Sequence, residues 1–437
     1  MAGYTGDGGP ATSASLNAPR VPVVDLTGNI IFADTDNNRI RRVAAATGVI
    51  TTLAGTGVGG FTGDGGPATS AGLAIPHGLT LDGSGHVIIA DTGNHRIRRV
   101  AVDSGIITTL AGNGVPGFGG DGGYATSASL HTPVEVAVDD SGSVLIADHR
   151  NHRIRHVAAT TGTITTLAGS GVGGFDGDGG PATSASLNFP AGLVVDGSGN
   201  LLIADHANHR VRRVAVATGV ITTLAGTGVA GFGGDGGPAT SARLYSPLML
   251  SLDSHGNVLI VDNSNHRIRR VAVETGVITT LAGTGANGFC GEGGPASSAE
   301  LHFPCGLAVD VNGNVLIADR GNHRIRRVSA PSLPTPSPTP TPSTTPYCQP
   351  ALFRALPRTD LVGSLVGTAL SPGEPVAQPT EASCRQACCD AAACDGYSFE
   401  AGTARFLGQA SCYLYVNITQ LTPVSGYVSG VRESLLL

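Results

Sequence analysis

The chain has 437 residues with a net charge of −6, and it contains 65 glycines, 26 prolines, 4% aromatic residues and no tryptophan. This composition predicts many short strands joined by tight turns. It lacks the basic excess that is typical of nucleic-acid-binding proteins. No stretch reaches the roughly 18 consecutive apolar residues of a membrane span, and the first residues lack the charged and apolar regions of a secretory signal.

A unit of constant length is repeated six times over residues 1–330. The pattern Ala-Asp-x-x-Asn-His-Arg-Ile returns every 57 residues, and a Gly-Asp-Gly-Gly loop keeps the same interval. The acids of the first pattern are Asp34, Asp91, Asp148, Asp205, Asp262 and Asp319, and those of the loop are Asp7, Asp64, Asp121, Asp178, Asp235 and Glu292. Self-similarity at this interval predicts one supersecondary unit per repeat, each burying its apolar face on its neighbours.

Each unit reads as four short strands. In the second unit we expect strands over residues 78–82, 86–90, 96–101 and 105–110, with polar turns between them. A long glycine-rich loop follows, and it includes a possible helical turn over residues 125–130. Four antiparallel strands per unit make one blade of a β-propeller, so the sequence predicts an all-β, six-bladed propeller.

The repeated pattern resembles the NHL-repeat propellers. Their signature of proline, a short apolar strand, glycine and then Ala-Asp-x-x-Asn-His-Arg-Ile matches all six units over residues 4–329, apart from small departures. In the first unit, for example, Asn38 stands where the other units have histidine. The resemblance implies the six-bladed fold expected from the strand pattern.

The fourth strand is missing from the sixth unit. The run Ile-Thr-Thr-Leu-Ala occurs five times, and after Val328 the chain passes directly towards Pro331. Propellers commonly close when an N-terminal strand completes the last blade. We therefore expect a sixth blade of three strands, and a natural protein that begins further upstream with a signal peptide and one more such strand.

Residues 331–346 alternate proline with serine and threonine. This composition favours an extended polyproline II linker and is also typical of O-glycosylated stalks. Six of the eight cysteines fall in residues 348–412, which is the density of a small disulfide framework formed in an oxidising compartment.

Residues 347–437 resemble a PAN/Apple-like domain, which is a small disulfide-rich α+β fold whose members bind proteins or carbohydrates. The resemblance rests on Cys-x3-Cys, then Cys-x-Gly-Tyr-Ser-Phe, then Cys-Tyr-Leu. It implies the disulfides Cys384–Cys412 and Cys388–Cys394, and it leaves Cys348 and Cys389 as the remaining pair. The pattern departs from the six-cysteine Apple form because no cysteine follows Cys412.

Two covalent features are predicted from single positions. Cys290 and Cys305 stand where the other repeats have no cysteine, and both lie in one connection of the sixth unit, so we expect a disulfide between them. Asn417 begins the only Asn-x-Ser/Thr sequon, so we expect it to carry an N-glycan.

The repeated polar residues have a structural and a functional interpretation. Histidine and arginine suit catalysis or phosphate binding, but a residue present in nearly every blade serves the blade. We expect Asp91 and Asn94 to satisfy the turn backbone, and Arg96 to reach an acid or a neighbouring blade. A calcium role for the Gly-Asp-Gly-Gly acids is disfavoured, because one carboxylate per loop is far short of six or more oxygen ligands.

Positions that vary between the repeats are better candidates for ligand contact. One set lies where the inner strand begins, and the other follows the repeated Asp. Both should lie at the same end of the central channel. The predicted ligand-binding residues are Arg20, His77, Glu135, Met249, His149, Arg150, His206, Asn263 and Arg320.

The alternative use of this ring is metal catalysis, as in lyase and lactonase propellers. It would require His77, Glu135, His149 and His206 to supply three ligands that converge on one ion. The scatter of these residues over three blades does not establish that arrangement. No Gly-x-Ser-x-Gly elbow or cysteine–histidine nucleophile pair is present, so no catalytic residue is assigned and no cofactor is expected.

The sequence thus predicts a secreted or cell-surface binding protein that recognises an extracellular protein or glycan through one propeller face and the C-terminal domain. The alternative is a secreted metal-dependent lyase or lactonase. Nucleic-acid binding is disfavoured by the negative net charge.

Overall fold

The computed structural model describes residues 2–330, 397–399 and 412–414. By their internal contacts the residues divide into two units, Met1–Pro331 and Ser332–Leu437. Within the described residues, no helix is long and apolar enough to cross a membrane.

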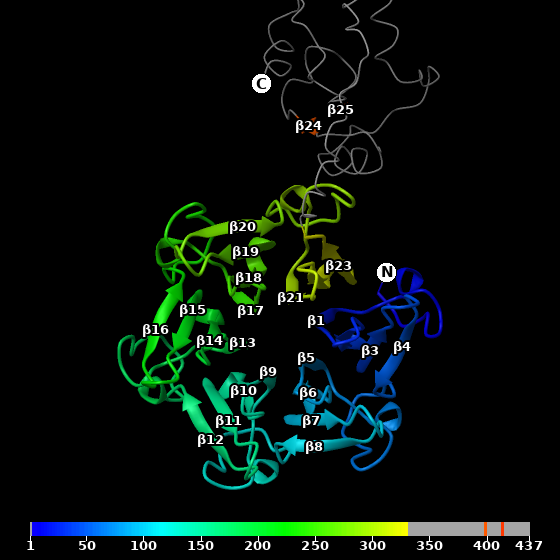
Figure 1. Cartoon of the computed structure of the whole chain (residues 1–437), viewed down its shortest axis with the longest axis vertical. Helices are drawn as coiled ribbons and strands as arrows, with labels where there is room; N and C mark the ends of the chain where they lie inside the picture. Colours follow the sequence, from blue (N-terminus) through cyan, green and yellow to red (C-terminus); the bar gives the residue numbers. More distant parts are fainter. Residues whose placement is uncertain (1, 331–396, 400–411, 415–437) are drawn as a thin grey trace, which may run out of the picture. The chain divides into compact units, whose positions relative to one another are not determined.

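The first unit is a ring of six antiparallel sheets around a central axis (Figure 1). The first three blades consist of β1 (Pro19–Val24), β2 (Ile30–Asp34), β3 (Arg39–Val43) and β4 (Ile50–Ala54); β5 (Pro76–Leu81), β6 (Val87–Asp91), β7 (Arg96–Val100) and β8 (Ile107–Ala111); and β9 (Pro133–Val138), β10 (Val144–Asp148), β11 (Arg153–Val157) and β12 (Ile164–Ala168). The fourth and fifth blades consist of β13 (Pro190–Val195), β14 (Leu201–Asp205), β15 (Arg210–Val214) and β16 (Ile221–Ala225); and β17 (Pro247–Leu252), β18 (Val258–Asp262), β19 (Arg267–Val271) and β20 (Ile278–Ala282). The sixth blade has β21 (Pro304–Val309), β22 (Val315–Asp319) and β23 (Arg324–Val328).

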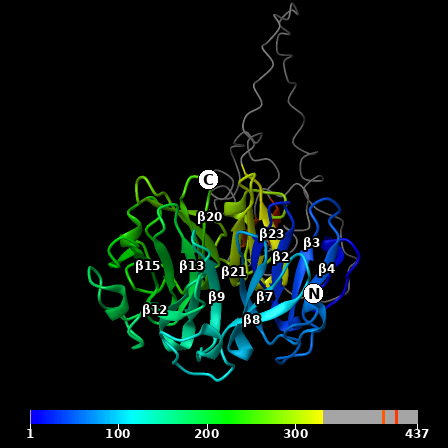
Figure 2. The same cartoon turned by 60° about the horizontal axis from the view of Figure 1, so that its bottom comes forward.

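The six-bladed fold and the three-stranded sixth sheet are as predicted. The expected strand positions are correct to within two residues at each end, and the expected helical turn is a short 3-10 turn, η5 (Ala125–Ser127). The first strand of each blade lines the axis, and neighbouring first strands contact one another around the ring. The last blade lies beside the first (Figure 2).

A buried ion-pair network stabilises each complete blade. In the second blade, Arg98 donates to Asp91 at 3.2 Å and to Asp64 of the Gly-Asp-Gly-Gly loop at 2.6 Å. Asp91 also accepts the backbone N–H of Ala74 and the side-chain amide of Asn94. The equivalent arginines are fully buried; they are Arg41, Arg98, Arg155, Arg212 and Arg269.

The structure corrects the expected role of Arg96. Its guanidinium donates to the backbone carbonyls of Asn94 and Asn113, and it stacks on the ring of Phe61 with 3.6 Å between Cζ and the ring centroid. Arg98 lies two residues further along the same face of the strand, and its guanidinium also lies over the Phe61 ring. It is Arg98 that pairs with the acids Asp64 and Asp91.

The repeated histidine joins each blade to the next. Its Nδ1 accepts a backbone N–H from the segment that leads into the next inner strand, as in His266 with Phe303 at 3.1 Å. His95, His152 and His209 make the same contact, and His323 closes the ring by accepting from Ala18. In the first blade the side-chain oxygen of Asn38 replaces Nδ1 and accepts from Ile75 at 2.8 Å.

In the second unit, β24 (Tyr397–Phe399) pairs antiparallel with β25 (Cys412–Leu414). They lie within the Cys-x-Gly-Tyr-Ser-Phe and Cys-Tyr-Leu motifs on which the resemblance rests. The PAN/Apple-like fold itself remains a prediction. The linker 331–346, the three predicted disulfides of this unit and the glycosylation of Asn417 lie outside the residues whose side chains the structure describes.

Candidate functional site at the channel mouth

The residue after the repeated Asp binds the neighbouring blade. Its side chain is hydrogen-bonded to the carbonyl of the proline that opens the next inner strand. The contacts are Thr35 to Pro76 (2.8 Å), Thr92 to Pro133 (2.6 Å), His149 to Pro190 (3.0 Å), His206 to Pro247 (3.2 Å) and Asn263 to Pro304 (2.8 Å). The residue type varies, but every one of these side chains can donate a hydrogen bond. Three of the predicted ligand residues, His149, His206 and Asn263, therefore have one polar group engaged within the protein.

The sixth blade departs from this rule. Arg320 occupies the equivalent position, in η12 (Arg320–Asn322), but the carbonyl of Pro19 is contacted by the thiol of Cys305, at 3.3 Å. Cys305 is a free, buried cysteine. The predicted Cys290–Cys305 disulfide is therefore wrong. Cys305 lies in the innermost strand, β21, whereas the carbonyl of Cys290 accepts from Arg326 in β23, two strands away. A disulfide requires Cα atoms within about 7 Å.

Cys305 should consequently be unreactive in the folded protein. Burial raises the pKa of its thiol to about 11, so the thiolate is scarce at pH 8. We expect iodoacetamide to alkylate Cys305 only after unfolding, as measured by peptide mass spectrometry with and without urea. Rapid alkylation in native buffer would contradict the burial.

Arg320 is left without the contact that its counterparts make, and its charge acts on both Arg20 and His77, which places the three side chains in one cluster. Arg20 is in β1 and His77 is in β5, each directly after the proline that opens the strand. Within the described part of the chain, the guanidiniums of Arg20 and Arg320 have neither a hydrogen bond nor an ion pair, and the Nε of each is buried without a partner. All other arginines of that kind, Arg41 and Arg212, have ion-paired terminal nitrogens.

The electrostatics of this cluster favour an anion. Burial lowers the pKa of Arg20, and the positive charge of Arg320 acts in the same direction. Burial also lowers the pKa of His77 well below its usual value, assisted by Arg20 and His149, and it lowers the pKa of His149 to about 4. At neutral pH the cluster therefore presents two charged guanidiniums beside two neutral imidazoles.

Other predicted ligand residues lie elsewhere. Arg150 is exposed, and its positive charge lowers the pKa of His95 and of His149 rather than that of Arg20. Glu135 and Met249 are buried one position deeper in the channel than the mouth cluster, together with Val21. These three side chains alternate around the ring with glycines at positions 78, 192 and 306. A Cβ at Gly78 would lie 2.5 Å from a Glu135 oxygen, and one at Gly306 would lie 2.5 Å from the nitrogen of Val21. Three side chains therefore fill this layer.

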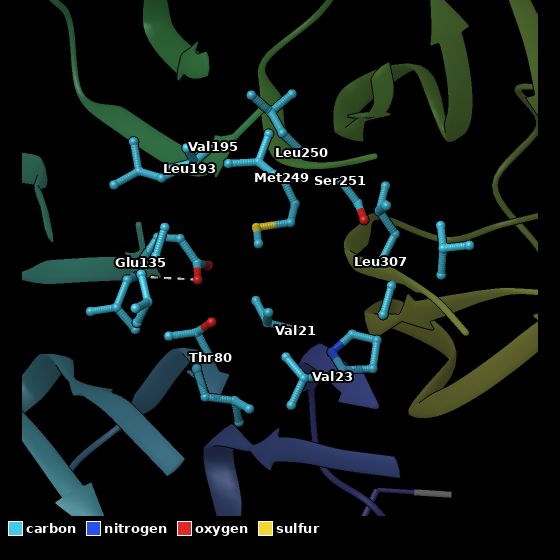
Figure 3. A pocket seen from close by; sticks show the side chains of 18 of the residues that line it. Val21, Val23, Thr80, Glu135, Leu193, Val195, Met249, Leu250, Ser251 and Leu307 are labelled. Carbon is cyan, nitrogen blue, oxygen red and sulfur yellow. Dashed lines mark hydrogen bonds between the residues drawn. The ribbon is translucent and has the colours of Figure 1, made fainter. Parts of the chain in front are cut away.

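Beyond that layer the channel widens into a cavity of about 280 Å³. Figure 3 shows Glu135 and Met249 directed into it from two sides, with Thr80 and Ser251 among aliphatic side chains. Burial raises the pKa of Glu135 well above its usual value, and one oxygen accepts the N–H of Val136. The Glu135 carboxyl lines the cavity and is close enough to Arg20 for the two charges to interact.

The histidines of the mouth do not gather around a common point. The ring centroids of His149 and His206 are 6.4 Å apart, and the Nδ1 of each contacts a proline carbonyl. Throughout residues 2–330, no three His, Cys, Asp or Glu side chains are placed to hold one metal ion.

The chain contains NHL repeats: the NHL repeat model matches residues 73–100, 130–157, 187–214 and 301–328. The chain is 29% identical to Protein SUPPRESSOR OF QUENCHING 1, chloroplastic, of Arabidopsis thaliana, covering 74% of this chain and 31% of that protein. It is also 29% identical to NHL repeat-containing protein 2 of Homo sapiens, covering 70% of this chain and 46% of that protein. The chain spans less than half the length of these curated relatives.

Solved propellers share the fold. An auxiliary nutrient binding protein from Bacteroides thetaiotaomicron superposes with a TM-score of 0.54 at 17% identity, covering 75% of this chain and 74% of that chain. A protein of unknown function from the same organism gives a TM-score of 0.55 at 19% identity, covering 74% and 72%. At these identities the likeness supports the fold and not a shared activity.

Proposed function

We propose that this NHL-repeat propeller is a non-catalytic binding module that captures an anionic group of an extracellular glycan at the channel mouth. The observation that carries the proposal is the pair Arg20 and Arg320, whose guanidiniums have no acceptor among the described residues. Arg20 and Arg320 are partly buried and the Nε of each is buried without a partner, whereas the fully buried Arg98 and Arg155 are ion-paired. A carboxylate or sulfate accepts bidentate hydrogen bonds from guanidinium groups.

An extracellular location is part of the proposal. It rests on the cysteine-rich C-terminal segment and the Pro/Ser/Thr linker, which are features of secreted and cell-surface proteins. The C-terminal segment would supply a second binding head, so that both could engage one matrix with increased avidity.

Stability distinguishes a ligand-binding arginine from a structural one. Arg20→Met should leave the unfolding midpoint unchanged or raise it, because it removes a desolvated charge that has no partner. Arg155→Met should lower the midpoint, because it leaves the carboxylate of buried Asp148 without its cation. Thermal unfolding of the two variants measures the contrast. A drop for Arg20→Met equal to that of Arg155→Met would indicate that Arg20 supports the fold.

Binding is tested with the full chain on an array of glycans that carry carboxylate or sulfate groups, next to neutral glycans of the same backbone. The double variant Arg20→Met/Arg320→Met should bind the anionic glycans roughly 10- to 100-fold more weakly, which is the size expected for lost hydrogen bonds to a charged group. Arg213→Met is the matched control, because Arg213 is exposed and lies near Asp196 on the outside of its blade. Unchanged binding by the double variant would refute the proposal.

A further inference from the structure

The five outer strands are each held along both edges. The inner edge pairs with the third strand of the blade, and the outer edge pairs with the Gly-Asp-Gly-Gly loop. In the fifth blade, Gly236 donates its N–H to the carbonyl of Ile278 at 2.8 Å, and the N–H of Ile278 donates to Gly237 at 3.0 Å. The same pair of bonds occurs on Ile50, Ile107, Ile164 and Ile221.

The outer strand also presents a fixed pattern of side chains. Ile278 and Ala282 are buried, at 0% and 1% exposure. The first threonine faces solvent, whereas Thr280 donates its hydroxyl to Asp235 of the loop at 2.6 Å and its N–H to the same carboxylate at 3.2 Å. In each complete blade, the second threonine of the outer strand is therefore hydrogen-bonded to the acid of the loop.

The residues after the strand tie it to the next blade. The N–H of Gly283 donates to Ala296 at 3.0 Å and that of Thr284 donates to Ala299 at 2.9 Å. Those alanines belong to or flank the 3-10 turn η11 (Ala296–Ser298) of the sixth blade. An outer strand thus bridges two blades.

The sixth blade keeps the loop that pairs with an outer strand in the other blades, but no described residue forms an outer strand there. Gly293 and Gly294 are the counterparts of Gly236 and Gly237, and neither the N–H of Gly293 nor the carbonyl of Gly294 has a described partner. The carbonyls of Ala11 and Ala14, in and beside η1 (Ala11–Ser13) of the first blade, lack the bonds that Ala296 and Ala299 receive.

The exposure of the surrounding side chains marks the same open position, which we call the slot: the space between β23 and the Glu292 loop. Glu292 is 63% exposed, whereas the carboxylates of its counterparts are between 32% and 36% exposed. Arg326 is 10% exposed and its counterparts are fully buried. Leu16, which would lie under the missing alanine, is 8% exposed, and its counterpart Leu73 is 0% exposed.

We propose that the slot between β23 and the Glu292 loop is a docking site for an extended peptide strand with the pattern Gly-Val-Ile-Thr-Thr-Leu-Ala-Gly-Thr. Bound antiparallel to β23, the strand places its isoleucine opposite Val328 and its second threonine opposite Arg326, as Ile278 lies opposite Val271 and Thr280 opposite Arg269. That threonine donates to Glu292, and the trailing Gly-Thr donates to Ala11 and Ala14. Strand addition of this kind draws affinity from the backbone and specificity from alternate side chains.

The test uses the full chain and a labelled peptide with the sequence of residues 276–284, by fluorescence anisotropy and hydrogen-exchange mass spectrometry. We expect saturable binding and slowed exchange confined to residues 324–328 and 293–296. A peptide with valine for its second threonine, or the protein variant Glu292→Leu, should bind roughly tenfold more weakly. A peptide with aspartate for isoleucine should not bind.

Two outcomes would overturn the proposal. One is fast exchange of residues 324–328 without any peptide binding, which would mean that the edge does not select a strand. The other is slow exchange of residues 324–328 before peptide is added, which would mean that another part of the chain, or a second copy, already fills the slot. Measuring that exchange at two protein concentrations separates those two occupants.

Discussion

Asp148→Ala should lower the free energy of unfolding by about 3 kcal/mol, because it removes a buried partner of a buried arginine. Asp148 accepts the N–H of His131 at 2.7 Å, the amide of Asn151 at 2.8 Å and the guanidinium of Arg155 at 3.2 Å. In its absence Arg155 keeps a single carboxylate partner, Asp121 at the rim of the network, beside the backbone carbonyls of Ser129 and Gly119.

Urea unfolding monitored by circular dichroism measures this loss. Asp140→Ala is the matched control, because Asp140 is exposed in the same blade, and its effect should stay within about 0.5 kcal/mol. Asp319→Ala should cost less than Asp148→Ala, because its partner Arg326 is partly exposed in the open blade. Equal midpoints for Asp148→Ala and Asp140→Ala would contradict a structural role for the network.

Acidification below about pH 6.5 should destabilise the propeller through its inter-blade histidines. The Nδ1 of each must be unprotonated to accept a backbone N–H, and burial lowers the pKa of His95, His152, His209, His266 and His323 below the ordinary 6.5. Around His266 the positive charges of His302 and Arg267 act in the same direction. Because the unfolded chain binds these protons more readily, stability is present above pH 6.5 and is lost as the pH falls towards the folded pKa values.

The first blade supplies the matched variant for this prediction. Asn38 makes the same contact without titrating, and it adopts the same left-handed backbone, with a φ of 50° beside 53° for His266. Replacing the five histidines with asparagine should preserve the melting temperature at pH 7.5 and flatten its decline between pH 7 and pH 5. If the variant and the parent chain lose stability equally over that range, the histidines do not control the acid response.

The strands and blades could be predicted because each 57-residue unit repeats the same alternation and turns. The pairing of Arg98 rather than Arg96 with the acids could not, because the two arginines share one face of β7 and both lie over Phe61. Which of them reaches Asp64 and Asp91 depends on where the loop and the neighbouring strand place those carboxylates. The Cys290–Cys305 prediction failed for a related reason: closeness in sequence within one connection does not place two residues at the same edge of a blade.

Only part of the channel-mouth site could be predicted from the sequence. Variation at the position after the repeated Asp was interpreted as freedom to contact ligand, but Thr35, His149 and Asn263 differ in type while contacting the same kind of carbonyl. A shared capacity to donate a hydrogen bond was the signal for that role. Arg320 departs from it because Cys305 contacts Pro19 instead, and that substitution is visible only when both blades are in place.

Locating a bound oxyanion tests the channel-mouth site most directly. Crystals of the full chain soaked in selenate would report its position through anomalous scattering. We predict a peak between the guanidiniums of Arg20 and Arg320 that disappears in Arg20→Met/Arg320→Met crystals soaked at the same concentration. Peaks found only beside exposed arginines such as Arg213, with none at the mouth, would contradict the proposed binding site.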